Sequence, residues 1–541
     1  MSKRVQHVTI VGGGTAGWLA AGILNAGLNR RCEEGDVRIT VIESPNIPTV
    51  GVGEATTISM NVTLNQLNLD ERDFLKQCNG SFKCAVKFAN WNHGAAGKPI
   101  DFWHPFSRPG YLYGHNATYH FMKLRRAGGP QDYGDAMFPS LKTIKDCRAP
   151  RQAEGKDYDG LFPYAYHLDA GLFADYMTTY ATNTGVEHVR DDVTAVNLDE
   201  RGFVRSLTLK EHGDWPVELV LDCTGFKGLI IKEALGEPFR PYSEHLLCDK
   251  ALAVQIPHQE GTKLESYTTS TGMNAGWSWR VPLYTRLGTG YVFSSAFASD
   301  DEAITEFRQY LKLPDDHPDP RVIPMRIGRS ERSWVKNCIA VGLAGGFIEP
   351  LESTSIHFTQ MALRWLIDFF PDKEMSPALA RHYNRVTRDL YEDIRDFIVL
   401  HYATSNRTDT PFWIEARADA RIPASIAERL ELWRHKLPGA LECNHNWSLF
   451  ESWNYIDVLM GKEWYGDREL PGEGAIAVDD FKEALARMAQ QADQIYATAP
   501  DHREVLTRIR ANDYRPWYNP VPGAAAPMID EIAGAAASAI A

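Results

Sequence analysis

The fold is decided by residues 8–18, which read VTIVGGGTAGW. The first four residues predict a strand, and the glycines after it have the G-x-G-x-x-G spacing in front of an alanine- and leucine-rich helix. Gly12 permits a tight turn, Gly14 lets backbone N–H groups approach a pyrophosphate, and Gly17 lets the helix pack closely on the strand. This stretch predicts the site for the ADP half of a dinucleotide.

A carboxylate follows the next predicted strand. The apolar run Val37–Ile42 ends at Glu43, which lies 26 residues after Gly17. At this place a carboxylate accepts the ribose hydroxyls and repels a 2′-phosphate, so NADP is disfavoured. We expect the site to comprise the glycine turn, including Thr15 and Ala16, together with Glu43.

Strands recur along the front of the chain and helices along the rear. Further strands are predicted at Val217–Leu221 and Cys338–Val341, each ending in glycine or a polar turn. From about Ser376 long helical runs take over, at Ala378–Ala403 and Asp479–Ala497. The pattern predicts an α/β front with a mostly parallel sheet and a mostly helical C-terminal part.

Two later segments favour FAD over NAD. One strand runs into DCTG, residues 222–225, and another runs into GLAGG, residues 342–346. They resemble the second and third cofactor contacts of the glutathione-reductase-like flavoproteins, which implies contacts from Gly225 and Gly342. Many of those flavoproteins have Asp directly after the third element's glycine, where this chain has Leu343. We therefore expect backbone groups to hold the flavin end.

The glycine-rich segment TVGVGEATT, residues 49–57, is a candidate cover for the isoalloxazine ring. Its expected cofactor contacts are Val50, Gly51, Glu54 and Ala55. A plain surface loop is the alternative interpretation.

These features predict a glutathione-reductase-like, Rossmann-type FAD-binding domain with a C-terminal, mostly helical substrate subdomain. We expect an FAD-binding core with an inserted substrate segment over residues 1–375, a helical substrate-side subdomain over residues 376–520 and a tail over residues 521–541. The tail is rich in alanine and is either loosely held or a terminal helix.

The number of dinucleotide motifs bears on how the flavin is reduced. A flavoprotein that reduces its own flavin with NAD(P)H often carries a second G-x-G-x-x-G unit, and this sequence has one. We therefore predict that a separate flavin reductase delivers FADH2. Single-component aromatic hydroxylases also have one such unit, so that alternative stays open.

Composition excludes several other classes of function. The net charge of −13, with acidic and basic residues interspersed, gives no field that attracts nucleic acid or an anionic membrane. The eight cysteines form no C-x-x-C pair, which is typical of a reducing cytoplasm, and we predict no signal peptide, no membrane span and no metal site. A P-loop and a G-x-S-x-G elbow are absent. The oligomeric state is open, and a homodimer is one option.

Residues 276–282, GWSWRVP, point to a particular family. They resemble the W-x-W-x-I-P signature of the flavin-dependent tryptophan halogenases, with Val281 in place of isoleucine. A strand here places Trp277, Trp279 and Val281 on one face, so packing into a core is the structural alternative. The resemblance implies that Trp277 and Trp279 stand beside the flavin and keep the substrate away from it, which suppresses hydroxylation.

Residues 79–91, NGSFKCAVKFANW, contain two lysines, Lys83 and Lys87. Period-two alternation puts Lys83 and Lys87 on the face opposite the apolar side chains, and a solvated lysine is the structural alternative. The resemblance implies that Lys83 lies at the inner end of a tunnel and meets hypohalous acid made at the flavin. It then forms a haloamine or donates a hydrogen bond, and the sequence leaves both options open. Lys87 is the rival position.

Residues 347–357, FIEPLESTSIH, precede a helical run. Ser353 and Thr354 are good N-cap residues, so the backbone N–H groups of Thr354 and Ser355 are expected to face an anion. The resemblance implies that Thr354 and Ser355 bind the halide, and that Glu352 stabilises the cationic substrate intermediate or helps to remove its proton. A capped core helix with an incidental glutamate is the structural alternative.

The substrate contacts follow from the same resemblance. Residues 101–106, DFWHPF, are similar to the family stretch that sandwiches an indole, which implies stacking by His104 and Phe106. The helical part is expected to supply the other wall, with Trp453 and Asn454. The paired tyrosines and trailing glutamate that hold the amino-acid group of free tryptophan are not recognisable, so indole, a substituted indole and a peptide-bound indole all remain candidate substrates.

The resemblance as a whole implies a two-component flavin-dependent halogenase. FADH2, oxygen and chloride or bromide would yield hypohalous acid, Ile356 would contact the cofactor, and Lys83 would direct the acid to the aromatic substrate. The main rival is a single-component FAD aromatic hydroxylase, and the other is a flavin-binding protein without catalytic activity.

Overall fold

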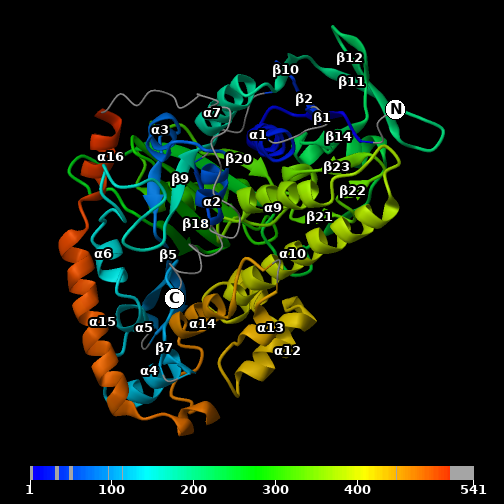
Figure 1. Cartoon of the computed structure of the whole chain (residues 1–541). Helices are drawn as coiled ribbons and strands as arrows, with labels where there is room; N and C mark the ends of the chain where they lie inside the picture. The colour runs from blue at the N-terminus through cyan, green and yellow to red at the C-terminus, as the bar shows by residue number, and fades with distance from the viewer. Residues whose placement is uncertain are drawn as a thin grey trace.

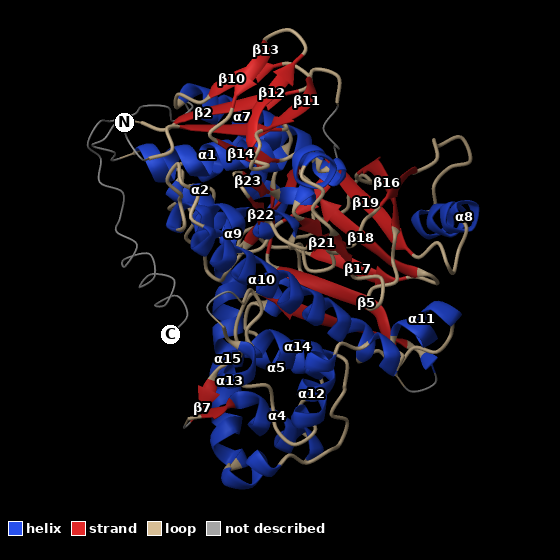
Figure 2. Ribbon diagram, turned by 90° about the vertical axis from the view of Figure 1, so that its right-hand side faces the viewer, coloured by secondary structure: helices blue, strands red, loops and turns tan. Residues whose placement is uncertain are grey.

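The computed structural model describes residues 4–30, 36–47, 53–94, 97–112, 114–445 and 448–511. Helix α10 (Pro377–Ala403) crosses the middle of the molecule in Figures 1 and 2. Most strands lie on one side of it, and Figure 2 places α4 (Ala117–Arg126), α5 (Tyr133–Met137), α12 (Ala424–Trp433) and α14 (Ser452–Gly461) together on the other, along with the short strand β7 (Tyr111–Leu112).

The predicted parallel sheet is present and contains the glycine turn. Its strand order is β10-β2-β1-β14-β23-β22, and all pairs are parallel except β22 with β23. The four predicted strands correspond to β1, β2, β14 and β23, with ends shifted by one or two residues. The bounds are β1 His7–Val11, β2 Arg38–Glu43, β10 Glu187–Arg190, β14 Leu219–Asp222, β22 Trp334–Val335 and β23 Cys338–Ala340.

A second, larger sheet is largely antiparallel, which the prediction of a mostly parallel sheet did not include. Its order is β20-β16-β19-β18-β17-β5-β6, and only β5 with β17 is parallel. Consecutive strands pair from β17 to β19 and from β5 to β6, whereas the pairings of β5 with β17 and of β16 with β20 join distant segments of the chain. The bounds are β5 Ala85–His93, β6 Pro99–Pro105, β16 Lys250–Pro257, β17 Thr268–Gly272, β18 Gly276–Pro282, β19 Arg286–Phe293 and β20 Arg321–Pro324.

The remaining strands form four smaller sheets, and one of these sheets carries Lys83. In that sheet β9 (Ala165–Asp169) lies between β3 (Gly53–Ala55) and β4 (Ser81–Lys83). The others are β11 (Val193–Leu198), β12 (Val204–Leu209) and β13 (Gly213–Pro216); β15 (Phe239–Pro241), β21 (Gly328–Ser330) and β24 (Gly346–Phe347); and β7 (Tyr111–Leu112) with β8 (His115–Asn116).

Helix α1 begins directly after the glycine turn and packs against α7 and α9, which cover the parallel sheet. The two predicted long helices are confirmed as α10 and α15, the first starting one residue earlier than predicted. The remaining bounds are α1 Thr15–Asn29, α2 Ser59–Gln66, α3 Glu71–Gln77, α6 Leu141–Lys145, α7 Ala170–Asn183, α8 Asp300–Leu311, α9 Ser355–Asp368, α11 Pro411–Ala416, α13 Ala440–Cys443, α15 Val478–Thr498 and α16 His502–Ala511.

One hydrophobic core runs through both parts of the chain. It includes Ile10 and Trp18 from the front, and Phe397 and Tyr455 from the helical rear. Helix α10 contributes most of the link, because it packs against α9 and β22 as well as α11 and α12. The division at residues 375 and 376 stays a prediction, and the predicted tail lies outside the described residues.

Candidate functional site

The glycine turn has the backbone geometry that the sequence predicts. Gly12 has a φ of +117°, and a Cβ there would lie 2.3 Å from the carbonyl oxygen of Cys223. A Cβ on Gly17 would lie 1.8 Å from the carbonyl oxygen of Gly12. Both positions therefore need glycine for the turn and for the close contact of helix and strand.

The space in front of this turn is open, as a cofactor site requires. A Cβ on Gly14, or on Gly225 at a φ of +69°, would meet no atom within 4 Å. Gly342 has a φ of +65° and faces Ala16, whose Cβ would lie 2.6 Å from an added Cβ. Three glycine elements from distant parts of the chain thus lie at the ends of neighbouring strands, and they fit a dinucleotide running from Gly14 past Gly225 and Gly342.

Glu43 lies at the end of β2 beside the turn. Its Oε2 is 2.8 Å from Nε2 of His188, and its carboxyl carbon would be 2.1 Å from a Cβ on Gly13. His188 in turn meets the edge of the Trp18 ring, with centroids 4.7 Å apart. The carboxylate therefore lies beside the glycine turn and has a histidine partner that sequence reasoning missed, and its contact with a ribose stays a prediction.

The two tryptophans of the GWSWRVP strand occupy different environments. Trp277 is 1% exposed, and its ring N–H donates a 2.7 Å hydrogen bond to Glu349. Trp279 is half-buried and lies flat across the sheet over Gly290, where a Cβ would be 2.0 Å from the indole. Trp277 is thus built into the core, and Trp279 alone of the pair borders open space.

That space is a hollow of about 200 Å³ beside β3. Glu54, next to its rim, has a pKa raised to about 7 by burial and by the charge of Asp169. Val50 and Gly51 lie outside the described residues, and Ala55 continues β3. The hollow is lined by Gly53, Ala253, Val254, Gln255, Trp279, Gly288, Thr289 and Arg321.

Lys83 is fully buried, which corrects the expectation from strand alternation that its face is the exposed one. Strand β9 pairs along one edge of β4, and the loop before α9 packs against the face that carries Lys83. The ammonium donates to the carbonyl oxygen of Thr56 at 3.1 Å and to the hydroxyl of Ser353 at 2.8 Å. Burial lowers the pKa of Lys83 to about 7, against an opposing effect of Glu352.

The rival lysine lies in ordinary surroundings. Lys87 is partly exposed and forms a 2.8 Å ion pair with Asp101. Its ammonium also lies over the Trp103 ring, 5.7 Å from the centroid. The structure therefore separates the two lysines, and Lys83 is the one inside the candidate site.

Glu352 is buried between two histidines. Its Oε1 accepts a 2.9 Å hydrogen bond from Nδ1 of His104 and lies 3.1 Å from Nε2 of His401. Asn454 donates to the other ring nitrogen of His104 at 2.8 Å, which assigns the neutral tautomer with its proton on Nδ1. Burial alone would raise the pKa of Glu352, but the two histidines lower it to about 2. The site thus holds a charged carboxylate.

The loop before α9 has a different cap from the one predicted. Thr354 occupies the N-cap position but makes no capping hydrogen bond, and its buried hydroxyl has no partner. Ser353 does not cap the helix, because its φ is +63° and its hydroxyl accepts from Lys83. Ser355 and Ile356 form the first turn, whose N–H groups have no intrahelical acceptors. An uncommitted hydroxyl and free N–H groups suit an anion.

The predicted substrate residues surround this carboxylate. Phe106 lies 5.3 Å from the Lys83 ammonium, measured to the ring centroid. The rings of His104 and Trp453 are 6.1 Å apart, and the N–H of Trp453 is buried without a partner. Asn454 acts through His104, whose ring nitrogens are both engaged.

Two further residues of the site escaped the sequence analysis. His401 lies in α10, and burial lowers its pKa to about 4, so it is neutral near pH 7. Glu349 accepts hydrogen bonds of 2.7 Å from both Trp277 and Tyr402, and burial raises its pKa to about 7. The sequence E-P-L-E shows that Glu349 and Glu352 lie three residues apart, but it does not show which side chains each glutamate contacts.

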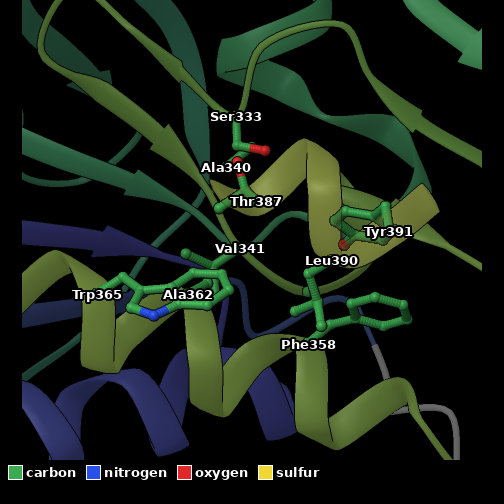
Figure 3. A pocket seen from close by; sticks show the side chains of 10 residues that line it. Ser333, Ala340, Val341, Phe358, Ala362, Trp365, Thr387, Leu390 and Tyr391 are labelled. Carbon is green, nitrogen blue, oxygen red and sulfur yellow. The ribbon is translucent and has the colours of Figure 1, made fainter. Parts of the chain in front are cut away.

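Figure 3 shows a small cavity behind the third glycine element, between α9 and α10. It has a volume of about 10 Å³, which is room for a single water molecule. Its walls are mostly apolar side chains from the two helices, so it is a gap in the packing. The labelled side chains in Figure 3 are Ser333, Ala340, Val341, Phe358, Ala362, Trp365, Thr387, Leu390 and Tyr391.

No group of three or more metal-binding side chains comes together within the described part of the chain. The described helices also include none with the length and apolar character needed to cross a membrane.

Known proteins resemble this chain over nearly its whole length. Residues 7–477 match the family model for tryptophan halogenase. The tryptophan 7-halogenase RebH of Lentzea aerocolonigenes is 38% identical over 537 residues, covering 94% of this chain and 99% of RebH. Among solved structures, the flavin-dependent halogenase BrvH of Brevundimonas sp. has a TM-score of 0.85 at 34% identity, covering 94% of this chain and all of BrvH.

A third relative differs in its substrate. The lanthipeptide tryptophan 5-halogenase MibH has a TM-score of 0.80 at 28% identity, and the match covers 95% of each chain.

Proposed function

This chain belongs to the tryptophan halogenase family, and from that premise we propose that it is a two-component flavin-dependent halogenase of an indole-type substrate. The observation that carries the proposal is the buried Lys83, which hydrogen-bonds Ser353 in the loop that also holds Glu352 and Thr354. Burying an ammonium costs free energy even when it has two hydrogen bonds, so the placement of Lys83 next to these groups supports a catalytic role.

The glycine elements are proposed to hold FAD, with Glu43 on the ribose and Trp279 next to the flavin end. The first turn of α9, including Thr354, Ser355 and Ile356, would bind the halide and the adjoining part of the cofactor. Bound there as FADH2, the cofactor would supply the two electrons that reduce oxygen to the peroxide level, and that oxygen would oxidise halide to hypohalous acid, leaving FAD and water. The separate reductase that delivers FADH2 is part of this proposal.

Lys83 is proposed to receive the hypohalous acid and present its halogen to the substrate. The pKa near 7 leaves both protonation states populated at neutral pH, so haloamine formation and hydrogen bonding both remain available. Glu352 stays charged next to neutral His401 and would stabilise the cationic ring intermediate or accept its proton. Phe106 and Trp453 would provide aromatic walls for the ring.

The hydroxylase alternative makes a different product from the same cofactor. Burial of Trp277 and the position of Trp279 beside the hollow favour halogenation, because an indole there would block an aromatic substrate from the flavin side. The seven described cysteines are all free, which supports the proposed cytoplasmic location.

The test incubates the protein with FAD, a flavin reductase, NADH, bromide and a panel of indoles, followed by mass spectrometry. Wild type should add bromine, whereas a product heavier by one oxygen would favour the hydroxylase. Lys83→Ala should bind FAD and consume oxygen but give no brominated product, and Lys87→Ala should resemble wild type. Brominated product from Lys83→Ala at the wild-type rate would refute the proposal. Without the reductase, NADH should leave bound FAD yellow.

A further inference from the structure

The carboxyl group of Asp457 is buried with too few hydrogen bonds. Asp457 is 1% exposed, and its Oδ1 has only a 3.5 Å contact from the hydroxyl of Tyr133. That hydroxyl is already engaged at 2.9 Å with Thr118. Oδ2 has no partner among the described residues. Buried polar groups are nearly always paired, so this carboxyl needs a partner from outside the folded chain.

Asp457 lies on the helix face that borders the candidate catalytic carboxylate. It is three residues after Asn454 in α14, so the two side chains occupy successive turns of one face. Asn454 donates to His104, which donates to Glu352. Trp453, four residues before Asp457, also has a buried N–H without a partner. One face of α14 thus offers an unused donor and an unused acceptor beside Glu352.

The electrostatics of this face suit a neutral ligand. Burial raises the pKa of Asp457 well above its usual range, and the negative charge of Glu352 adds to the effect while the Tyr133 hydrogen bond opposes it. This shift favours the protonated acid, which still has an acceptor oxygen. The nearby Arg108 is paired with Glu451 at 2.8 Å, so the carboxylate of a free amino acid would have to compete for it.

We propose that Asp457 determines substrate specificity by accepting the ring N–H of a neutral 3-substituted indole, with the Trp453 N–H available to an acceptor on the 3-substituent. This inference rests on the proposed function and names its substrate class. A residue that pairs with the ring N–H would orient the flat ring relative to Lys83 and Glu352, and so would select which carbon reacts.

The test measures binding, so it does not depend on turnover. Dissociation constants of 3-methylindole and 1,3-dimethylindole are determined by calorimetry for wild type, Asp457→Asn and Asp457→Leu. Wild type and the Asn variant, which keeps an acceptor oxygen, should prefer the N–H compound by about tenfold, the equivalent of one hydrogen bond. The Leu variant should lose that preference, because its side chain offers no acceptor.

Asp393 provides a matched control. It is another buried acid with an unpartnered Oδ2, and burial raises its pKa to about 7, but it lies in α10 near Arg429. Asp393→Asn should leave the preference unchanged. Asp457→Ala serves if the Leu variant does not fold, with the same expected loss of preference.

Two results would overturn the inference: equal affinity of wild type for both indoles, or an unchanged preference in the Leu or Ala variant. Failure of the proposed function looks different, because indoles would then bind with the predicted preference while no halogenated product formed.

Discussion

Lys83 donates a 2.8 Å hydrogen bond to Ser353, a residue 270 positions later in the chain. Ser353 lies between Glu352, which faces the two histidines, and Thr354, which begins α9. One hydroxyl therefore joins the lysine to the loop that carries the carboxylate and the helix turn proposed to bind the halide. The left-handed backbone of Ser353 is what turns its side chain to Lys83 and away from the helix it would otherwise cap.

Removing that hydroxyl should uncouple the lysine from the loop. We expect Ser353→Ala to keep wild-type affinity for FAD but to lose about tenfold in product formation, since Lys83 then has only Thr56 as a partner. Ser353→Gly should lose as much activity while raising Tm, because glycine adopts a φ of +63° without strain. Rates from single-turnover halogenation and melting curves check both, and full activity in either variant would contradict the role.

The charge on Glu352 should tune the lysine. Glu352 raises the pKa of Lys83 against the stronger lowering by burial, so Glu352→Gln should move the Lys83 pKa from about 7 to a lower value. Nitrogen-15 NMR of labelled lysines gives the titration, with the Lys83 signal identified by its absence in Lys83→Ala. A pKa in the variant equal to or above that of wild type would contradict this electrostatic coupling.

His188 should position Glu43 for the ribose. We expect His188→Ala to weaken FAD binding by about tenfold, because the carboxylate loses the partner that orients it. When Glu43→Gln is already present, adding His188→Ala should weaken FAD binding little further. A mutation that only loosened the sheet would weaken FAD binding equally with and without Glu43→Gln.

The control for this prediction is His212→Ala, which breaks a similar 2.7 Å pair with Asp191 outside the glycine turn. Its FAD affinity, read from the quenching of flavin fluorescence, should equal that of wild type. Additive losses from Glu43→Gln and His188→Ala would count against a positioning role.

Acid should destabilise the fold through buried histidines. Burial lowers the pKa values of His357, His401 and His502 to about 4, compared with 6.5 for an exposed histidine. The unfolded chain therefore binds more protons than the folded one between pH 6.5 and 4, so the free energy of unfolding falls as the pH drops through this window. Calorimetry at several pH values should show the fall, and His357→Gln should reduce the slope. A Tm that is constant across the window would contradict it.

The glycine turn, Glu43 and the long helices were predictable because they depend on local backbone rules. Gly12 needs a positive φ whatever the rest of the chain does, and a strand followed by three spaced glycines already implies the cofactor turn. Resemblance to the family likewise predicted Lys83 and Glu352 as the pair to examine, and the structure places Lys83 in β4 against the loop that holds Glu352.

Which site side chains are buried, and which residues they contact, was decided only by the tertiary structure. Alternation along β4 indicates which side chains share a face, but the packing of the loop before α9 against that strand is what buries Lys83. The partners of Glu352 come from β6 and α10, which are hundreds of residues apart from each other, and the pairing of β5 with β17 in the large sheet is non-local in the same way. Local sequence determines how the backbone turns, whereas the desolvation and charge that set a side chain's chemistry come from whichever distant segments pack against it.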